Sequence, residues 1–217
     1  MSRSCSHALA GAVKRCIEEL IEETDGEGNL SVRFIDKRRG FGTFGTRRFC
    51  EGEQIFVERP LLTVPHTEFS FPPSLDRAEV DRRGKQLLTA SVDKALARLD
   101  ADASNRFFAL SAAHCYQHDS RSLGIFQTNA MRTSACGTSS VFALVSRINH
   151  SCSPNVLHCW NERHGELTLH AACDIELGTE LSISYIPLAT AAGLSHQARQ
   201  ARLRDSFGFC CECERCA

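Results

Sequence analysis

The chain has 217 residues, of which 42% are hydrophobic and 24% are charged, and its formal net charge is -1. A chain of this length buries roughly 70% of its unfolded surface, which gives one domain a sufficient core. No apolar run approaches the ~20 residues of a membrane helix, and the near-neutral charge gives no strong nucleic-acid signal. We therefore expect a globular, monomeric protein. Two charged stretches, at 36–39 and 81–83, are interpreted as solvated loops.

The N-terminal apolar run at 8–13 is too short for the core of a signal peptide, so we expect an intracellular protein, cytoplasmic or nuclear. The twelve cysteines are then free thiols or metal ligands rather than disulfides. Seven of them are scattered among mostly apolar neighbours and are predicted to be small buried side chains. These are Cys5, Cys16, Cys50, Cys115, Cys136, Cys159 and Cys173.

The first half of the chain predicts a mixture of strands and helices. Apolar residues recur at helical spacing over 9–21, which predicts one amphipathic helix. Runs at 31–35 and 54–58 predict two strands around a tight glycine loop at 39–45. The stretch 74–113 predicts two or three helices that bury their apolar residues. The predicted core residues here are Leu87, Leu88, Leu96, Leu99, Phe107, Phe108 and Leu110.

In the second half, Ser139 or Ser140 is expected to cap a helix through 141–148, which the segment 149–154 would end. Short strands are predicted at 156–160, 166–171 and 181–185, because Leu167 alternates with Leu169 and a second apolar pair alternates in the last strand. A basic helix follows at 195–207. Together these elements predict a single compact domain, mainly β with helical insertions.

A dense cysteine tail ends the chain. A short loop of this kind can hold several thiolates about 2.3 Å from one Zn²⁺, although a closed structural site needs four ligands. Cys210, Cys213 and Cys216 have a spacing that could begin an iron-sulfur site. Cys211, Cys213 and Cys216 instead leave one zinc position open. Cys152 is the attractive fourth ligand, and a thiolate there would fasten the tail to the segment around it.

Ordered motifs give the chain a family resemblance. Residues 149–155 (NHSCSPN), 180–185 (ELSISY) and 209–216 (FCCECERC) follow residues 39–42 (RGFG) and 52–56 (GEQIF). This set resembles the SET-domain protein lysine methyltransferases, and the nearest branch looks like the SET-and-MYND (SMYD) type. A lone NHSC would be weak evidence, whereas the ordered set is highly specific.

The resemblance implies a fold of small curved β-sheets in which the segment after residue 149 meets the 181–185 strand in a pseudoknot. A zinc-binding post-SET segment would end the chain. The implied parts are an N-terminal helix and lead-in (1–30), a first SET part (31–65), a helical insertion (66–137), a second SET part (138–190), and the post-SET helix and tail (191–217).

The resemblance also implies residue roles. S-adenosylmethionine would be lined by the backbone of Gly40, Phe41 and Gly42, by Asn149 and His150, and by Phe209 against its adenine. Tyr185 would be the catalytic tyrosine, with Phe207 and Asn129 in the substrate channel. Zn²⁺ would be held by Cys152, Cys211, Cys213 and Cys216, which leaves Cys210 as a non-ligand.

The residue chemistry agrees with these roles. Glycines let a backbone approach a bulky cofactor, and Asn149 and His150 offer both donors and acceptors. The simpler alternatives are that these two residues cap a helix and that Tyr185 is a half-buried strand residue. Methyl transfer to lysine is an in-line displacement that needs alignment and a neutral amine, whose unperturbed pKa is about 10.4. With Phe207 in place of a hydroxyl-bearing side chain, products beyond monomethyl-lysine are hypothesised.

Two departures from the SMYD pattern bear on partners. No cysteine lies between Cys50 and Cys115, so we expect the MYND zinc module to be absent. The chain ends one residue after Cys216, so the helical C-terminal domain of that branch is also expected to be absent. The partner is a protein lysine, histone or non-histone, which the sequence does not identify. The rival interpretation is a catalytically silent SET-like module that binds a partner through a zinc-stabilised surface.

Overall fold

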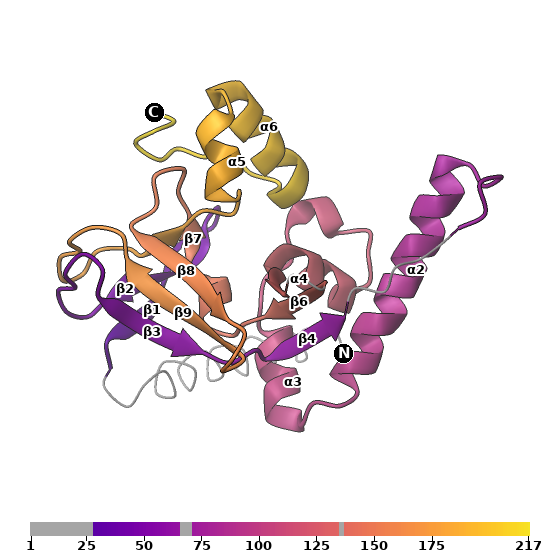
Figure 1. Ribbon diagram of the computed structural model, residues 1–217, viewed down its shortest axis with the longest axis horizontal. Helices are drawn as coiled ribbons and strands as arrows, with labels where there is room; N and C mark the ends of the chain where they lie inside the picture. Colours follow the sequence, from indigo (N-terminus) through magenta and orange to yellow (C-terminus); the bar gives the residue numbers. More distant parts are fainter. Residues whose placement is uncertain (1–27, 66–70, 135–136) are drawn as a thin grey trace, which may run out of the picture.

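The computed structural model describes residues 28–65, 71–134 and 137–217. The helix predicted at 9–21, with Cys5, Cys16 and Cys136, lies outside these residues. Figure 1 shows small sheets on one side, the helices of an insertion on the other, and the C-terminal helices above them. Within the described ranges, no helix has both the length and the apolar composition to cross a bilayer.

The first sheet pairs β1 (Leu30–Asp36) with β2 (Gly40–Gly45) in antiparallel register. The predicted glycine loop is therefore wrong, because this segment is itself a strand and only 37–39 form the turn. Gly40 takes a φ of 70°, as the turn requires. Gly42 is glycine for a different reason, since a Cβ there would lie 2.5 Å from the side chain of Ile35.

The central sheet has the strand order β3-β9-β8 and its strands are antiparallel. These strands are β3 (Gln54–Glu58), β8 (Val156–Asn161) and β9 (Glu166–Ala171). Leu167 and Leu169 are both buried, which confirms the alternation predicted from the sequence. This sheet carries much of the larger hydrophobic core.

A third sheet, of order β4-β6-β5, joins the central sheet to the insertion. Its strands are β4 (Leu62–Pro65), β5 (Met131–Ser134) and β6 (Thr138–Val141). The helix predicted over 141–148 is wrong, because β6 occupies its start and only a short 3-10 helix η2 (Val145–Arg147) follows. The apolar run there is buried on all sides between two cores, and a fully buried run has no face that distinguishes helix from strand.

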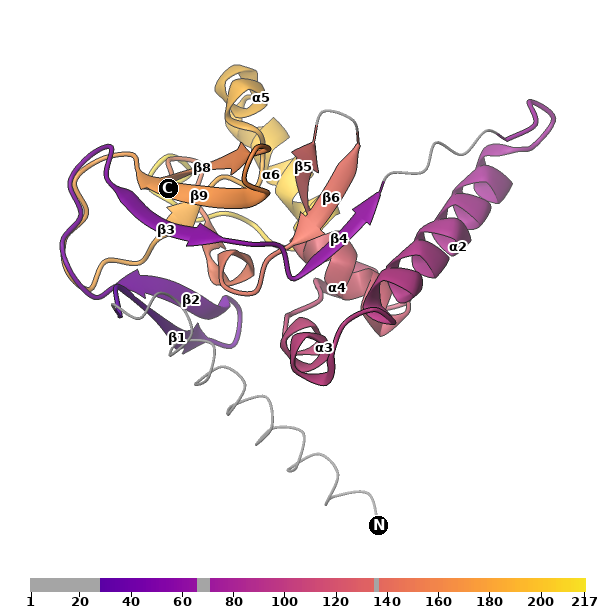
Figure 2. The same cartoon turned by 60° about the horizontal axis from the view of Figure 1, so that its bottom comes forward.

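The insertion contains the helices predicted after residue 74. These are α2 (Arg77–Leu96), α3 (Ala101–Phe108), η1 (His114–Tyr116) and α4 (Arg121–Asn129). Figure 2 shows α2 projecting outward from β4. Phe107 and Leu110 are buried as predicted, whereas Leu87 is 40% exposed and is not a core residue. The charged stretch 81–83 lies inside α2, so its interpretation as a loop is wrong.

The C-terminal part consists of α5 (Leu188–Gly193), α6 (His196–Phe207) and the cysteine tail. The side chain of Ser195 caps the first turn of α6, and Gly208 ends that helix with a φ of 76°. A separate small core includes Leu203 and Ile186 together with Cys152 and Cys211, and Cys213 and Cys216 pack against it.

The scattered cysteines do not behave as the sequence predicted. Cys50, Cys115, Cys159 and Cys173 are all exposed. Cys159 lies in the outward-facing part of β8, an edge strand, where three successive residues are exposed. Apolar sequence neighbours therefore did not indicate burial: Cys50, Cys115 and Cys173 lie outside the strands, and the edge strand β8 leaves both of its faces exposed around Cys159.

Candidate active site

A short parallel pairing brings two distant segments together. β7 (Asn149–His150) pairs with β10 (Ser182–Ile183), and the N–H of Ser151 donates to the Ile183 carbonyl at 3.0 Å. Tyr185 follows β10 directly. The meeting of these segments, expected from the resemblance, is confirmed.

Tyr185 is held at both its backbone and its hydroxyl. Its phenol donates a hydrogen bond to the Ile148 carbonyl at 2.9 Å, and its backbone N–H donates to Nδ1 of His150 at 3.0 Å. Burial raises the pKa of the Tyr185 phenol well above its usual range. The hydroxyl therefore stays protonated, and its oxygen lone pairs remain as acceptors.

His150 links the tyrosine to the cysteines. Because Nδ1 accepts from the Tyr185 N–H, the ring proton is on Nε2, which lies 3.3 Å from the Cys152 sulfur. Burial, with a smaller effect from the charge of Arg199, lowers the pKa of His150 to about 4. The imidazole is therefore neutral at physiological pH and holds one fixed tautomer.

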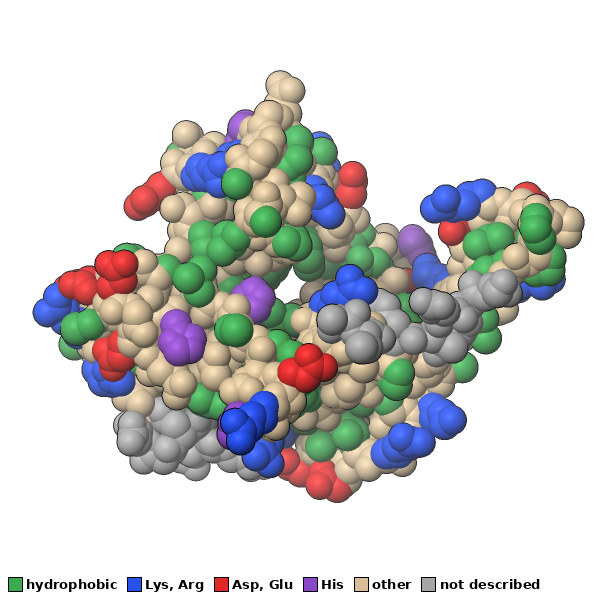
Figure 3. Space-filling model, viewed as in Figure 1, with side chains coloured by type: hydrophobic (Ala, Val, Ile, Leu, Met, Phe, Trp, Pro, Cys, Tyr) green, Lys and Arg blue, Asp and Glu red, His purple; other side chains and the backbone are tan. Residues whose placement is uncertain are grey.

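Aromatic rings form a wall around this tyrosine. The Tyr185 ring centroid lies 4.8 Å from that of Phe207, and His150 lies 6.0 Å from Phe209. The two phenylalanines also contact each other, at 6.4 Å. Figure 3 shows a hollow between the C-terminal part and the sheets, with hydrophobic side chains along its margin.

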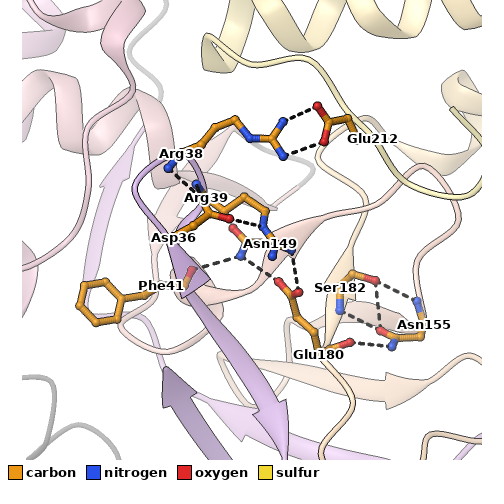
Figure 4. Close-up of polar contacts among 9 residues, drawn as sticks. All are labelled: Asp36, Arg38, Arg39, Phe41, Asn149, Asn155, Glu180, Ser182 and Glu212. Carbon is orange, nitrogen blue, oxygen red and sulfur yellow. Dashed lines mark hydrogen bonds and ion pairs between the residues drawn. The ribbon is translucent and has the colours of Figure 1, made fainter. Parts of the chain in front are cut away.

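Asn149 has a defined amide orientation. Its Nδ2 donates to the Phe41 carbonyl at 3.1 Å and to Glu180 at 3.0 Å (Figure 4). Glu180 in turn pairs with Arg39 at 3.1 Å. A Cβ on Gly42 would lie 3.0 Å from both the Asn149 amide nitrogen and the Glu180 carboxylate, so the glycine makes room for this contact.

Four of the predicted metal ligands converge. The sulfur atoms of Cys152, Cys211, Cys213 and Cys216 lie within 4.8 Å of one another and could hold a metal ion. Ligands about 2.3 Å from a tetrahedral zinc are about 3.8 Å apart. The measured sulfur distances from Cys152 are 3.9 Å to Cys211 and 3.5 Å to Cys216. Cys210 lies outside this group of ligands and is exposed.

The charge around these thiols is uneven. Burial opposes ionisation of Cys213, yet neighbouring N–H and thiol groups lower its pKa to about 6. Burial raises the pKa of Cys211 to about 12. A metal ion reverses the second effect, because it binds the thiolate and releases the proton.

Several contacts attach the tail to the rest of the molecule. Gln200 in α6 exchanges two hydrogen bonds with the backbone of Cys211, at 2.7 and 2.9 Å. Arg38, in the turn between β1 and β2, makes a two-pronged ion pair with Glu212 at 2.5 and 2.7 Å (Figure 4). The tail thereby connects α6 to the turn that precedes β2, the glycine strand (Gly40–Gly45).

Sequence reasoning gave no separate role to three charged residues, Glu58, Glu180 and Arg199, although Glu180 begins the 180–185 motif. Arg199 is only 4% exposed, and it donates to the Leu194 carbonyl at 3.0 Å and lies 3.7 Å from the Cys216 sulfur. Such a charge offsets that of nearby thiolates. The sequence does not distinguish Arg199 from the other arginines of the basic helix, so its burial could not be predicted.

Asn129 lies at the end of α4 and uses its amide locally. Its Nδ2 donates to the carbonyls of Ser111 and Ile125, both at 2.8 Å. These bonds fasten the helix end. A role for Asn129 in the substrate channel stays a prediction.

Comparison with known proteins agrees with this architecture, since residues 40–186 match the SET domain family. The chain is 33% identical over 181 residues to "Histone-lysine N-methyltransferase set5" of Schizosaccharomyces pombe, covering 82% of this chain and 48% of that protein. It is 38% identical over 76 residues to "Histone-lysine N-methyltransferase SMYD3" of Homo sapiens, covering 35% of this chain and 16% of that protein. It is 40% identical over 76 residues to "Histone-lysine N-methyltransferase ATXR4" of Arabidopsis thaliana, covering 35% of this chain and 22% of that protein.

The chain thus spans about half the length of the first of these relatives and smaller shares of the others. The family match extends from the glycine strand through the residue after Tyr185, and so includes β7, β10 and the pairing between them. The chain belongs to the SET-domain family.

Proposed function

We propose that this protein transfers a methyl group from S-adenosylmethionine to the side-chain amine of a protein lysine. The observation that carries the proposal is the Tyr185 hydroxyl, which donates to the Ile148 carbonyl within an aromatic wall. The printed names of the relatives support a histone lysine as the first substrate to test.

The residues present suit the cofactor. We propose that it is held by the backbone of Gly40, Phe41 and Gly42, by Asn149 and His150, and by the ring of Phe209. The carboxamide oxygen of Asn149 accepts no hydrogen bond from the described residues, so it can receive a donor of the cofactor. The cofactor supplies an electrophilic methyl group on a sulfonium.

Tyr185 and its neighbours orient and desolvate the lysine amine. Because the phenol proton is donated to the Ile148 carbonyl, the phenol oxygen accepts an N–H of the lysine amine. The nitrogen lone pair then points away from Tyr185 and is free to attack the methyl group. The rings of Phe207 and Phe209 exclude water, which favours the neutral amine that is needed for attack. No side chain has to protonate the departing thioether.

We further propose that Zn²⁺ binds the four converging cysteines in a structural role. The donor set and the sulfur separations support a closed tetrahedral site. The metal then fixes the position of Phe209, which lies in the tail, next to Phe207 at the end of α6. Arg199 balances part of the thiolate charge.

A methyl-transfer assay with labelled cofactor and core histones tests this function. Tyr185→Phe is expected to lose most activity while retaining cofactor affinity, because the ring remains and only the hydroxyl is removed. Tyr116→Phe is the matched control, since it changes the other tyrosine of the chain and should keep full activity. Near-normal turnover by Tyr185→Phe would reject the proposed role of this tyrosine.

The rival, a catalytically silent module, predicts a different result. Calorimetry of the folded, metal-loaded protein against S-adenosylmethionine separates the two readings. Absence of binding would favour the silent module and end the enzymatic proposal.

A further inference from the structure

We infer that Glu180 is a positioning residue that sets the amide orientation of Asn149 and so selects a cofactor with a cationic hydrogen-bond donor. This inference rests on the proposed cofactor site and deepens it. Glu180 comes from the loop before β10, whereas Asn149 belongs to β7, and their side chains meet beside the glycine strand (Figure 4).

The geometry fixes which end of the Asn149 amide faces the site. Both hydrogens of Nδ2 are used, one by the Phe41 carbonyl and one by the Glu180 carboxylate. Turning the amide over would place its oxygen against two acceptors, with no hydrogen between them. The native orientation leaves Oδ1 as a pure acceptor.

Glu180 is itself held in place at both ends. Its second carboxylate oxygen accepts from Arg39 at 3.1 Å, and Arg39 pairs with Asp36 at 3.1 Å. Its backbone carbonyl accepts from the side chain of Asn155 at 2.9 Å. The carboxylate therefore has little freedom to follow Asn149 if the amide turns.

The combination favours one kind of ligand group. Oδ1 of Asn149 can bind only a donor. Glu180 and Asp36 share one arginine, Arg39, so this group of three charges keeps a net negative charge beside the amide. Of the donors on S-adenosylmethionine, the α-ammonium alone carries a positive charge. The α-ammonium is therefore the group that this oxygen would meet, and Glu180 fixes the orientation of that acceptor.

A double-mutant cycle measured by calorimetry tests the coupling. Glu180→Ala should raise the Kd for S-adenosylmethionine about tenfold, the effect of one lost charge-assisted contact. Asn149→Ala should have a similar effect, and the double variant should be no worse than Asn149→Ala alone. Glu180→Gln keeps an acceptor oxygen for Asn149 and should retain most of the affinity. Glu176→Ala, which removes another loop carboxylate, is the control and should bind normally.

A cofactor analogue makes the assignment specific. An S-adenosylhomocysteine analogue that lacks the α-amino group should bind wild type and Glu180→Ala equally, whereas S-adenosylhomocysteine itself should distinguish them. An equal loss with both compounds would indicate general damage and overturn the inference. The side-chain amide NMR signals of Asn149 in the free protein give a readout independent of the cofactor. Glu180→Ala should shift these signals, and unchanged signals would also overturn the inference.

The outcomes separate this inference from the function on which it rests. If wild type binds S-adenosylmethionine and Glu180→Ala binds it as tightly, the positioning role is wrong and the proposed function stands. If wild type does not bind the cofactor at all, the proposed function fails and the inference fails with it. Additive effects in the double variant would mean that Glu180 does not act through Asn149.

Discussion

Removing the carboxylate of Glu58 should destabilise the turn that leads into the active site. Glu58 ends β3 and accepts hydrogen bonds from three consecutive backbone N–H groups, those of Ala143, Leu144 and Val145, at 2.8, 2.9 and 2.9 Å. Ala143 and Leu144 lie between β6 and η2, and Val145 is the first residue of η2, so none of these N–H groups has a strand or helix partner among the described residues. Glu58→Ala therefore leaves three donors without an acceptor.

The size of the effect follows from those three bonds. At about 1.5 kcal/mol for a hydrogen bond to a charged group, the gross loss is roughly 4.5 kcal/mol. The alanine variant no longer desolvates a carboxylate, which offsets part of that loss, so we expect a net cost of about 3 kcal/mol. For a chain of this length, the melting temperature should fall by about 6–12 °C.

Thermal and urea unfolding of the metal-loaded protein measure this change. Glu58→Gln should lose about half as much stability as Glu58→Ala. The glutamine oxygen can still accept from the N–H groups of Ala143 and Leu144, whereas its NH₂ group faces the N–H of Val145. Glu51→Ala, at an exposed position, is the control and should change stability by less than about 0.5 kcal/mol. A loss below about 1 kcal/mol for Glu58→Ala would refute the reasoning.

The same carboxyl gives a signed dependence on pH. Burial raises the pKa of Glu58 above 4.5, and the three N–H groups act in the opposite direction without cancelling it. A carboxyl with a raised pKa in the folded state stabilises most below its unfolded pKa and loses that stabilisation as pH rises through the folded value. The stability advantage of wild type over Glu58→Gln should therefore shrink as the pH rises above 4.5. An advantage that grows over that range would show that the N–H groups dominate.

Three further experiments test the site. Cys152→Ser should lower bound zinc below one equivalent by metal analysis and abolish cofactor binding by calorimetry. Cys210→Ser is the control and should keep both the zinc and the cofactor binding. Full zinc and activity in Cys152→Ser would contradict our interpretation of the cluster. Phe207→Tyr adds a hydroxyl near Tyr185 and should shift the product towards monomethyl-lysine, and an unchanged product distribution by mass spectrometry would count against that channel role. Burial raises the pKa of both Tyr185 and Tyr116. The absorbance of the native protein at 295 nm and pH 10 should therefore show less than half of the full phenolate signal. A phenolate signal of half or more would indicate that both tyrosines have ordinary pKa values.

The ordered motifs named Asn149, His150, Tyr185 and the set of four cysteines, and the fold brings these residues close together. The spacing of the cysteines alone had left two ligand sets open, and several elements around the site were predicted wrongly. The segment 141–148 was misjudged because its side chains are buried between two cores and show no periodicity. Gly42 was assigned to a tight glycine loop, although it is a strand residue whose neighbours leave little room for a side chain.

The roles of the buried and paired charged residues were harder to predict from the sequence. Glu58 and Glu180 each bond to partners more than 30 positions away, at Ala143 and Asn149, and no local pattern carries that information. Arg199 is buried on the face of a helix whose other basic residues are mostly exposed. Such roles depend on tertiary contacts and become visible only once the chain is folded.

If the four cysteines hold a metal ion and the cofactor binds beside Asn149 as proposed, His150 couples the two sites. One of its ring nitrogens accepts from the N–H of Tyr185 and the other lies 3.3 Å from the Cys152 sulfur. Thermodynamic linkage is reciprocal: if a metal ion strengthens cofactor binding by some factor, the cofactor must strengthen metal binding by the same factor. A chelator should consequently strip metal from the cofactor-bound protein at a higher concentration than from the free protein. Cofactor supply would then help to keep the metal in place.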